Sequence, residues 1–279
     1  MALVVNTNMN ALTIENTLTN TNNAVSSSLQ KLSSGLRINS AKDDPAGQAI
    51  GNSFKAAISS MNVASQNANQ AQSMLQIADG AYTQINDILV QMKSLATEAA
   101  SGQQTSANLT SLNGEFVKLQ GEIDQIAQST QYGTTSLING NATATNGITF
   151  QVGATNVSSN QVVVSFNGAT TGCMNVGSTS VGIGSLASAQ AAMTAIDSAL
   201  TSINAFMGNI GAFQNQLQYT VSNLTTSIQN YTSSESTIMD VDMAAEVSNL
   251  TKNQILQQAG TAMLAQANAQ PQQILKLLS

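Results

Sequence analysis

The sequence predicts a mainly α-helical protein: a long antiparallel coiled-coil helical rod with a small β-hairpin, and N- and C-terminal helices paired at the same end. Three observations support this fold class. Apolar residues recur at alternating steps of three and four along three segments, one shorter segment alternates like a strand, and both ends of the chain are apolar at helical spacing. With 279 residues, 42% of them hydrophobic, the chain can bury a sizeable core.

The longest helical pattern begins at Phe54 and ends at Ala99. A seam sustained over about six heptads is typical of a long coiled-coil helix. Alanine dominates its first half, where a partner helix can approach closely, and larger side chains follow. The seam consists of Phe54, Ala57, Met61, Ala64, Ala68, Ala71, Leu75, Ala78, Tyr82, Ile85, Leu89, Met92, Ala96 and Ala99.

Two further seams predict the other helices of the rod. In the later seam Gln214 is the one polar member, which is either a tolerated defect or a contact that sets register. The first seam consists of Leu109, Leu112, Phe116, Leu119, Ile123 and Ile126. The second consists of Leu186, Ala189, Met193, Ile196, Leu200, Ile203, Met207, Ile210, Gln214, Leu217, Val221, Leu224, Ile228 and Tyr231.

Between these two helices the pattern changes to that of strands. Residues 147–168 place β-branched and aromatic residues on both sides of the turn-forming "GATNVSSN", which predicts one β-hairpin. Its flanks, 139–146 and 168–184, are rich in Gly, Ser, Thr and Asn, so we expect surface loops. The run "GIGS" lacks the spacing and the lysine of a phosphate loop, and Ser185 is instead predicted to cap the next helix.

The composition excludes several classes of function. A net charge of −6 without any Lys or Arg cluster argues against nucleic-acid binding. The chain has no His and one Cys, Cys173, which we interpret as a small buried hydrophobe. Without a paired-carboxylate cleft, a nucleophile–base pair or a cofactor motif, we expect no enzyme, no metal and no cofactor. The sequence also lacks a membrane-spanning segment and a cleaved signal peptide, so no membrane insertion is expected.

Charge is scarce, at 8% of residues, yet it gathers in "SSGLRINSAKDDPAGQAI" at 33–50, which holds the chain's one arginine. Pro45 suits a first helical turn and disfavours helix at Asp44. Asp43 and Asp44 are therefore expected near a helix N-terminus, where the macrodipole favours anions. Arg37 and Lys42 are expected to pair with these carboxylates or with those of a neighbouring molecule.

This stretch resembles the N-terminal signature of bacterial flagellins. The resemblance continues through "QNANQAQSMLQIADGAYTQIND" at 66–87, "TTSLINGN" and "FQVGA". It closes with "EVSNLTKNQILQQAGTAMLAQANAQPQQILKLL" at 246–278. It covers nearly the whole chain and indicates a short flagellin that retains the inner-core and core helical domains and lacks most of the outer variable domains.

The resemblance implies a structural subunit that polymerises into the flagellar filament for swimming motility. It implies five segments: an N-terminal inner-core helix and spoke at 1–44, the first two rod helices at 45–138, the hairpin and a short variable loop at 139–184, the C-terminal rod helix at 185–233 and a C-terminal inner-core helix at 234–279. The spoke would contribute Leu36, Arg37, Asn39, Lys42, Asp43, Asp44 and Pro45 to the subunit interface. The terminal core would be packed by Leu18, Val25, Leu29, Leu32, Val247, Leu250, Ile255, Leu264, Ile274 and Leu277.

The resemblance also implies partners and a location. Besides other copies of the chain, these are a flagellar export chaperone, the filament cap and hook-associated proteins, with the subunit exported to the extracellular filament without a cleaved signal peptide. The family's innate-immune receptor site falls on Gln91, Leu95 and Glu115. Gln91 replaces the usual arginine, so weak receptor activation is expected. The alternatives are a hook–filament junction protein and, less favoured, a secreted coiled-coil adhesin.

Overall fold

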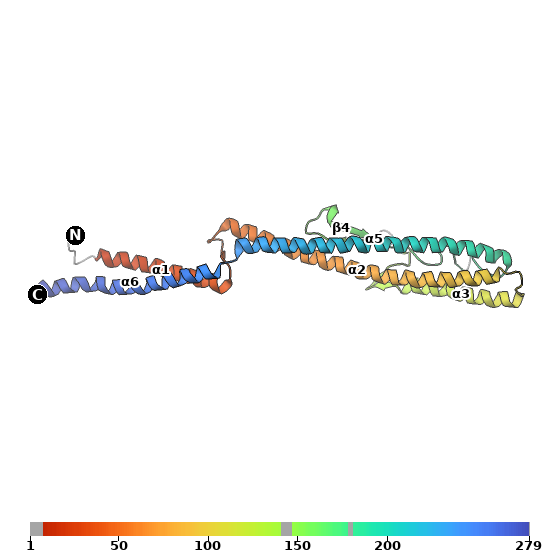
Figure 1. Ribbon diagram of the computed structural model, residues 1–279, viewed down its shortest axis with the longest axis horizontal. Helices are drawn as coiled ribbons and strands as arrows, with labels where there is room; N and C mark the ends of the chain where they lie inside the picture. Colours follow the sequence, from red (N-terminus) through yellow and green to blue (C-terminus); the bar gives the residue numbers. More distant parts are fainter. Residues whose placement is uncertain (1–7, 141–146, 178–180, 279) are drawn as a thin grey trace. The chain divides into compact units, whose positions relative to one another are not determined.

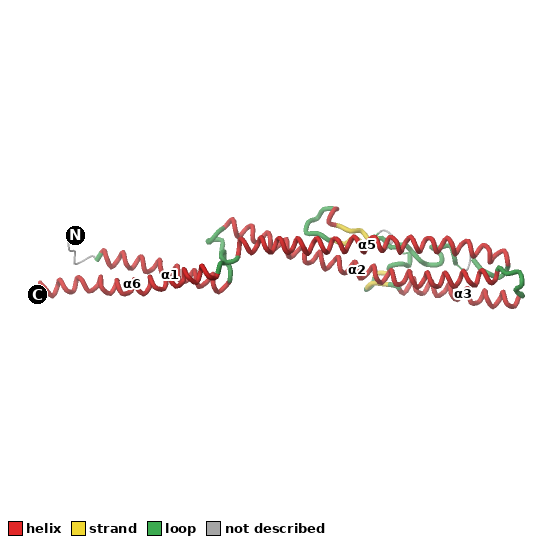
Figure 2. Tube along the Cα trace, in the orientation of Figure 1, coloured by secondary structure: helices red, strands yellow, loops and turns green. Residues whose placement is uncertain are grey.

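The computed structural model describes residues 8–140, 147–177 and 181–278, with side chains up to residue 270. Helices dominate this part of the chain, which confirms the mainly α fold class (Figures 1 and 2). The helices are α1 (Met9–Ser34), α2 (Pro45–Ala99), α3 (Ser106–Ser129), α5 (Leu186–Met239) and α6 (Met243–Leu278). The short elements are β1 (Gln131–Tyr132), β2 (Thr135–Ser136), β3 (Ile148–Gln151), the 3-10 helix η1 (Ser158–Asn160) and β4 (Gln161–Val164).

The chain forms two compact units, and each is described by itself. The rod unit comprises Ser59–Ile228, and the terminal unit comprises the described residues before Ser59 and from Gln229 onward. The boundary between the units falls within α2 and within α5. The five-segment division inferred from the sequence stays a prediction.

In the rod unit, α2 and α5 run antiparallel, and α3 lies alongside α2 (Figure 1). Lys93 near the end of α2 forms an ion pair with Asp197 near the start of α5. Further along, the rings of Tyr82 and Phe206 pack with centroids 5.8 Å apart. Every seam residue from Met61 to Ala99 is buried, so the predicted coiled-coil seam is confirmed in this unit.

The seam of α5 is only partly as predicted. One position of each heptad is buried, namely Ala189, Ile196, Ile203, Ile210, Leu217 and Leu224, and the seam residues between them from Met193 to Ile228 are half-buried. Leu186 and Tyr231, at the two ends of the seam, are 48% and 40% exposed, so their predicted burial is wrong. Ala192 and Ala199 are buried instead. The core that α5 joins contains residues of α3 and of the segment after the hairpin as well as the α2 seam, so more than one side of α5 is covered.

The predicted β-hairpin is confirmed. Strands β3 and β4 pair antiparallel from Ile148 opposite Val164 to Gln151 opposite Gln161, and residues 152–160 form the connection. A second, two-residue hairpin was missed: β1 pairs with β2 around Gly133, which adopts a positive φ of 62°. A strand of two residues is too short to show the alternation of apolar and polar residues by which strands are predicted.

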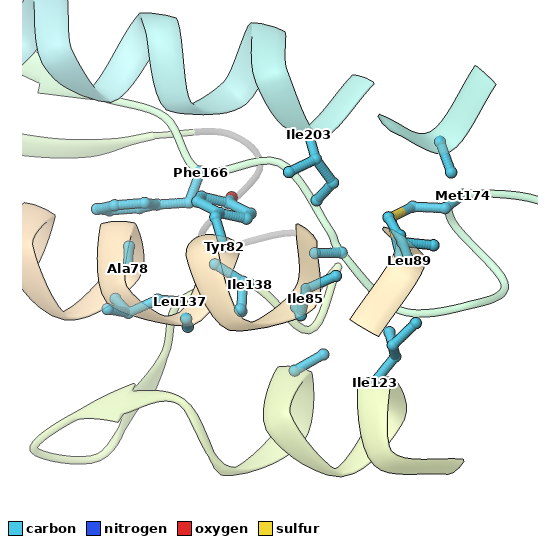
Figure 3. Packing of buried hydrophobic residues seen from close by; sticks show 14 of the residues in the cluster. Ala78, Tyr82, Ile85, Leu89, Ile123, Leu137, Ile138, Phe166, Met174 and Ile203 are labelled. Carbon is cyan, nitrogen blue, oxygen red and sulfur yellow. The ribbon is translucent and has the colours of Figure 1, made fainter. Parts of the chain in front are cut away.

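The segment after the hairpin contributes to the core, which corrects the expectation of a surface loop for the described residues 168–177 and 181–184, whereas 178–180 lie outside the described residues. We call residues 166–177 and 181–183 the strap. Phe166, Ala169, Met174, Val176 and Ile183 of the strap are each at most 6% exposed. Figure 3 shows Phe166 and Met174 facing α2 together with Ile203 of α5. The apolar residues of the strap are irregularly spaced and show no helix or strand period. The high content of Gly, Ser and Thr around them therefore led to the prediction of a surface loop.

Polar side chains of α3 hold the strap in place. The Asp124 carboxylate accepts hydrogen bonds from the backbone N–H and the hydroxyl of Thr171, both at 2.8 Å. The buried Gln120 amide donates to the carbonyls of Val176 and Val181 at 2.6 and 3.0 Å. Because residues without regular structure must satisfy their backbone groups elsewhere, these bonds allow the strap to be buried.

Cys173 lies on the strap and is exposed. The interpretation of this cysteine as a buried hydrophobe is therefore wrong. Its neighbour Met174 turns into the core instead, at 6% exposure.

The terminal unit is organised by α1 and α6, which pair antiparallel (Figure 1). The Asn8 amide donates to the carbonyl of Ala267 at 2.9 Å, and the Gln257 amide donates to the Asn22 side chain at 2.7 Å. The predicted pairing of the N- and C-terminal helices is thus confirmed. No helix in the described ranges is long and apolar enough to cross a bilayer.

Candidate functional site: the spoke and the paired terminal helices

The spoke, residues 35–44, begins where α1 ends. Gly35 terminates α1 in the left-handed conformation, with φ of 72°, and its N–H donates to the carbonyl of Lys31 at 2.9 Å. A residue with a Cβ would be strained there. The left-handed conformation of Gly35 ends the helix at Ser34 and turns the chain into the spoke.

The spoke is fixed to the segment between α5 and α6 by main-chain hydrogen bonds. Val241 N–H donates to the carbonyl of Gly35 at 3.0 Å, and Arg37 N–H donates to that of Met239 at 2.6 Å. These two bonds form an antiparallel bridge of Leu36 with Asp240. The two chain segments of the terminal unit are therefore joined at the spoke by backbone as well as by side chains.

Arg37 strengthens this junction from the solvent side. Its Nε and Nη2 atoms donate to the same acceptor, the main-chain carbonyl of Ile238, at 3.2 and 2.6 Å. A charged donor makes such bonds stronger than neutral ones. No carboxylate of the described residues forms an ion pair with Arg37 or Lys42, so their expected pairing within the chain with Asp43 or Asp44 is wrong. Pairing with a neighbouring molecule stays a prediction.

Asp43 closes the turn of the spoke. Its Oδ2 atom accepts hydrogen bonds from the N–H groups of Asn39 and Ser40 at 3.1 and 3.0 Å, and from the Ser40 hydroxyl at 3.1 Å. The bond from Asn39 and then those from Ser40 hold the pKa of this carboxyl below its ordinary value of 3.8. The carboxylate is thus engaged in local structure.

Asp44 and Pro45 start α2 as predicted. Asp44 Oδ1 accepts from the N–H groups of Ala46 and Gly47 at 3.1 and 3.0 Å, which makes Asp44 the N-cap. Pro45 is the first helical residue, where its missing N–H costs nothing. A Cβ at Gly47 would lie 2.5 Å from Ile38 Cδ1, so the glycine leaves room for the buried Ile38 side chain against the first turn of α2.

The other half of this junction, at Asp240 and Asp242, was not predicted from the sequence. Asp242 Oδ1 accepts from the N–H groups of Ala244 and Ala245 at 3.0 and 3.1 Å and so caps α6, as Asp44 caps α2. Asp240 accepts from the Ser236 hydroxyl at 2.6 Å. The signal was present in "MDVDM" at 239–243, where two acidic residues break an otherwise helical pattern.

The predicted terminal-core residues divide into two groups. Leu18, Val25, Leu32, Leu250 and Leu264 are half-buried in the terminal unit. Leu29, Val247 and Ile255 are 50%, 48% and 60% exposed, so the contacts within one chain do not cover them. The side chains of Ile274 and Leu277 lie outside the described residues. Packing of all ten residues in an assembled core stays a prediction.

The expected receptor residues lie in the rod unit. Gln91 and Leu95 occupy consecutive turns of α2, and Glu115 lies on α3. Gln91 and Glu115 are exposed, whereas Leu95 is only 9% exposed. Their role in receptor binding stays a prediction. Ser185, by contrast, caps α5 as predicted, since its hydroxyl accepts from Ser188 N–H at 3.2 Å.

Comparisons with known proteins agree with the fold. Residues 5–143 match the family described as bacterial flagellin N-terminal helical region, and residues 193–278 match bacterial flagellin C-terminal helical region. A flagellin of Xenorhabdus nematophila is 37% identical over 100% of both chains. The chain belongs to the bacterial flagellin family. The flagellar filament 33 kDa core protein of Treponema phagedenis matches this flagellin at 35% identity over 99% of the chain and 100% of that relative.

This flagellin is a short form, as predicted. A flagellin of Salmonella muenchen is 40% identical to it but aligns over 55% of this chain and only 30% of its own length. Among solved structures, one described as a flagellar hook-associated protein of Vibrio parahaemolyticus is similar with a TM-score of 0.59, over 70% of this chain and 99% of that one. At 15% identity this likeness concerns the fold alone.

Proposed function

We propose that copies of this flagellin join one another through the exposed apolar faces of α1 and α6, and that the spoke sets their register. The chain is a structural subunit of the bacterial flagellar filament and belongs to a structural, non-enzymatic family.

The observation that carries the proposal is the apolar surface left uncovered on the terminal pair. Leu29 on α1, and Val247 and Ile255 on α6, are each about half exposed or more. Apolar faces on paired helices call for a further partner. Helices that lie on membranes carry Lys and Arg along their polar face, and these helices have few. Another copy of the chain is therefore the favoured occupant.

The contact between copies must be heterologous, because a filament grows only where different surfaces meet and the symmetry does not close. Arg37 and Lys42 are exposed and uncompensated by any carboxylate of their own chain within the described residues. On a surface with so little charge, two cations of the spoke without an ion pair provide orientation. We assign them to contacts with acidic groups of a neighbouring copy.

Finer partners follow from the same role. We propose that an export chaperone covers the apolar terminal helices before assembly, and that the filament cap and hook-associated proteins contact the two ends of the polymer. The subunit would reach the extracellular filament without a cleaved signal peptide.

The test is growth on seeds. Purified protein is added to sheared filaments of the same chain and followed by negative-stain microscopy. Long filaments are the expected result. Monomers that never extend a seed would contradict the proposal and favour a junction protein present in few copies.

A matched pair of variants tests the surface itself. Ile255→Asp places a charge on the exposed face of α6 and should stop growth. Val117→Asp is the control, because Val117 is 42% exposed on α3 of the rod unit. Equal loss of growth in both variants would show that α6 has no special part in assembly.

A further inference from the structure

The methionines of this flagellin are distributed unevenly. Met9, at the start of α1, is 62% exposed, and Met243 and Met263 on α6 are 49% and 58% exposed. The other described methionines are buried or half-buried: Met61, Met74, Met92, Met174, Met193, Met207 and Met239. Within the part of the chain that the structure describes, exposed thioethers are thus confined to the helices that the proposed function assigns to assembly.

Each exposed methionine lies on an exposed apolar face. Met9 is followed three residues later by Leu12, which is 49% exposed, and Met243 is followed four residues later by Val247. Met263 lies seven residues after Leu256, which is 48% exposed. Residues at these spacings share one side of a helix. The thioethers are therefore part of the surfaces that a second copy would cover.

We propose that Met9, Met243 and Met263 are three peroxide-sensitive modification sites whose oxidation blocks assembly, and whose burial in the filament protects them. The inference rests on the proposed function. In the reaction the thioether sulfur attacks one oxygen of the peroxide, the O–O bond breaks, a sulfoxide forms and water leaves. Sulfur is oxidised by two electrons and the peroxide is reduced.

Oxidation to the sulfoxide makes the apolar surface proposed for assembly more polar. It replaces a flexible apolar group with a polar one, and Met-rich contacts are disrupted by this change. A sulfoxide buried between copies without a donor loses its hydration. The modification is reversible by methionine sulfoxide reductases, so a blocked subunit is recoverable.

The experiment treats monomers with hydrogen peroxide, removes it and measures seeded growth. Cys173→Ser is used as the background in every sample, because the exposed Cys173 would otherwise be oxidised as well. Peptide mass spectrometry locates the sulfoxides. We expect oxidation at the three exposed methionines and a rise in critical concentration on the order of tenfold. Reductase treatment should reverse this rise.

Two comparisons complete the test. A triple variant carries Met9→Leu, Met243→Leu and Met263→Leu, and its seeded growth is measured with and without peroxide treatment. The two samples of this variant should grow equally. Intact filaments treated first and then dissociated should yield unmodified Met9, Met243 and Met263.

The outcomes separate the two proposals. Equal growth of untreated and fully oxidised monomers would overturn this inference and leave the proposed function intact. Equal loss of growth in the leucine variant would also overturn it, because the sensitivity would then lie elsewhere. Untreated monomers that never grow would overturn the proposed function and this inference together.

Discussion

The guanidinium of Arg37 binds the main-chain carbonyl of Ile238 through Nε at 3.2 Å and Nη2 at 2.6 Å. This contact joins residues 201 positions apart in sequence and links the spoke to the end of α5. Among the described residues Nη1 has no hydrogen-bond or ion-pair partner, and the Arg37 side chain is exposed.

Replacing this arginine should impair assembly more than folding. We expect Arg37→Ala to lower seeded growth by about tenfold, since hydrogen bonds from charged groups are lost. Arg37→Lys should restore little, because an ammonium cannot reproduce the planar fork. Helix content by circular dichroism should stay at the wild-type level. Lys93→Ala in the rod unit is the control for loss of one surface cation. Filaments of wild-type yield and length from Arg37→Ala would refute the assignment of Arg37 to a contact between copies.

Acid should weaken the spoke through Asp43. The hydrogen bonds from Asn39 and Ser40 lower the folded-state pKa of this carboxyl below 3.8. The carboxylate therefore stabilises the folded state above pH 3.8, and this contribution is lost as the pH falls through the lowered pKa. Asp43→Asn should therefore reduce the thermal midpoint of the terminal unit near neutral pH. Wild type and variant should converge in strong acid.

The control for this prediction is Asp87→Asn, which changes an exposed carboxylate in the last third of α2, within the rod unit. It should leave the pH dependence of the midpoint close to that of wild type. A midpoint difference between wild type and Asp43→Asn that persists unchanged into strong acid would count against the assigned role.

The contact between α3 and the strap should matter for stability. Asp124→Ala removes the carboxylate that accepts from Thr171 N–H and Oγ1 and leaves a half-buried N–H unpaired. We expect a loss of roughly 2–4 kcal/mol in the free energy of unfolding, measured with urea. Asp197→Ala removes only a surface ion pair with Lys93 and should cost about 1 kcal/mol or less. Equal effects would contradict the special role of the strap.

Receptor activation should depend on Gln91. If the family's site is retained, the uncharged amide of Gln91 cannot make the bidentate contact of an arginine. The wild-type protein should activate a receptor reporter cell weakly, and Gln91→Arg should raise the response by about tenfold. Gln84→Arg, also exposed on α2, is the matched control. A strong wild-type response would overturn the expectation.

The helices were predictable because their signal is periodic. Each residue of the α2 seam from Met61 to Ala99 is buried, and this could be inferred by counting steps of three and four. The hairpin followed from two short strand-like runs around a turn. Asp44 and Pro45 were predictable because capping residues act within one helical turn, so the local sequence contains the whole interaction.

The strap and the partner of Arg37 were not predictable for a different reason. Phe166, Met174 and Ile183 pack into the core at irregular spacing, and only the tertiary fold brings them to α2 and α3. The acceptor of Arg37 is a main-chain carbonyl, which every residue possesses, so side-chain identity could not mark Ile238. The search for an opposite charge therefore pointed to the wrong group.

A cryo-electron microscopy structure of filaments grown from this chain would show whether copies join through α1 and α6. We expect α1 and α6 to lie at the smallest radius, with Leu29, Val247 and Ile255 packed against other copies. A filament in which these three side chains face solvent, with copies joined through the rod unit alone, would contradict this expectation.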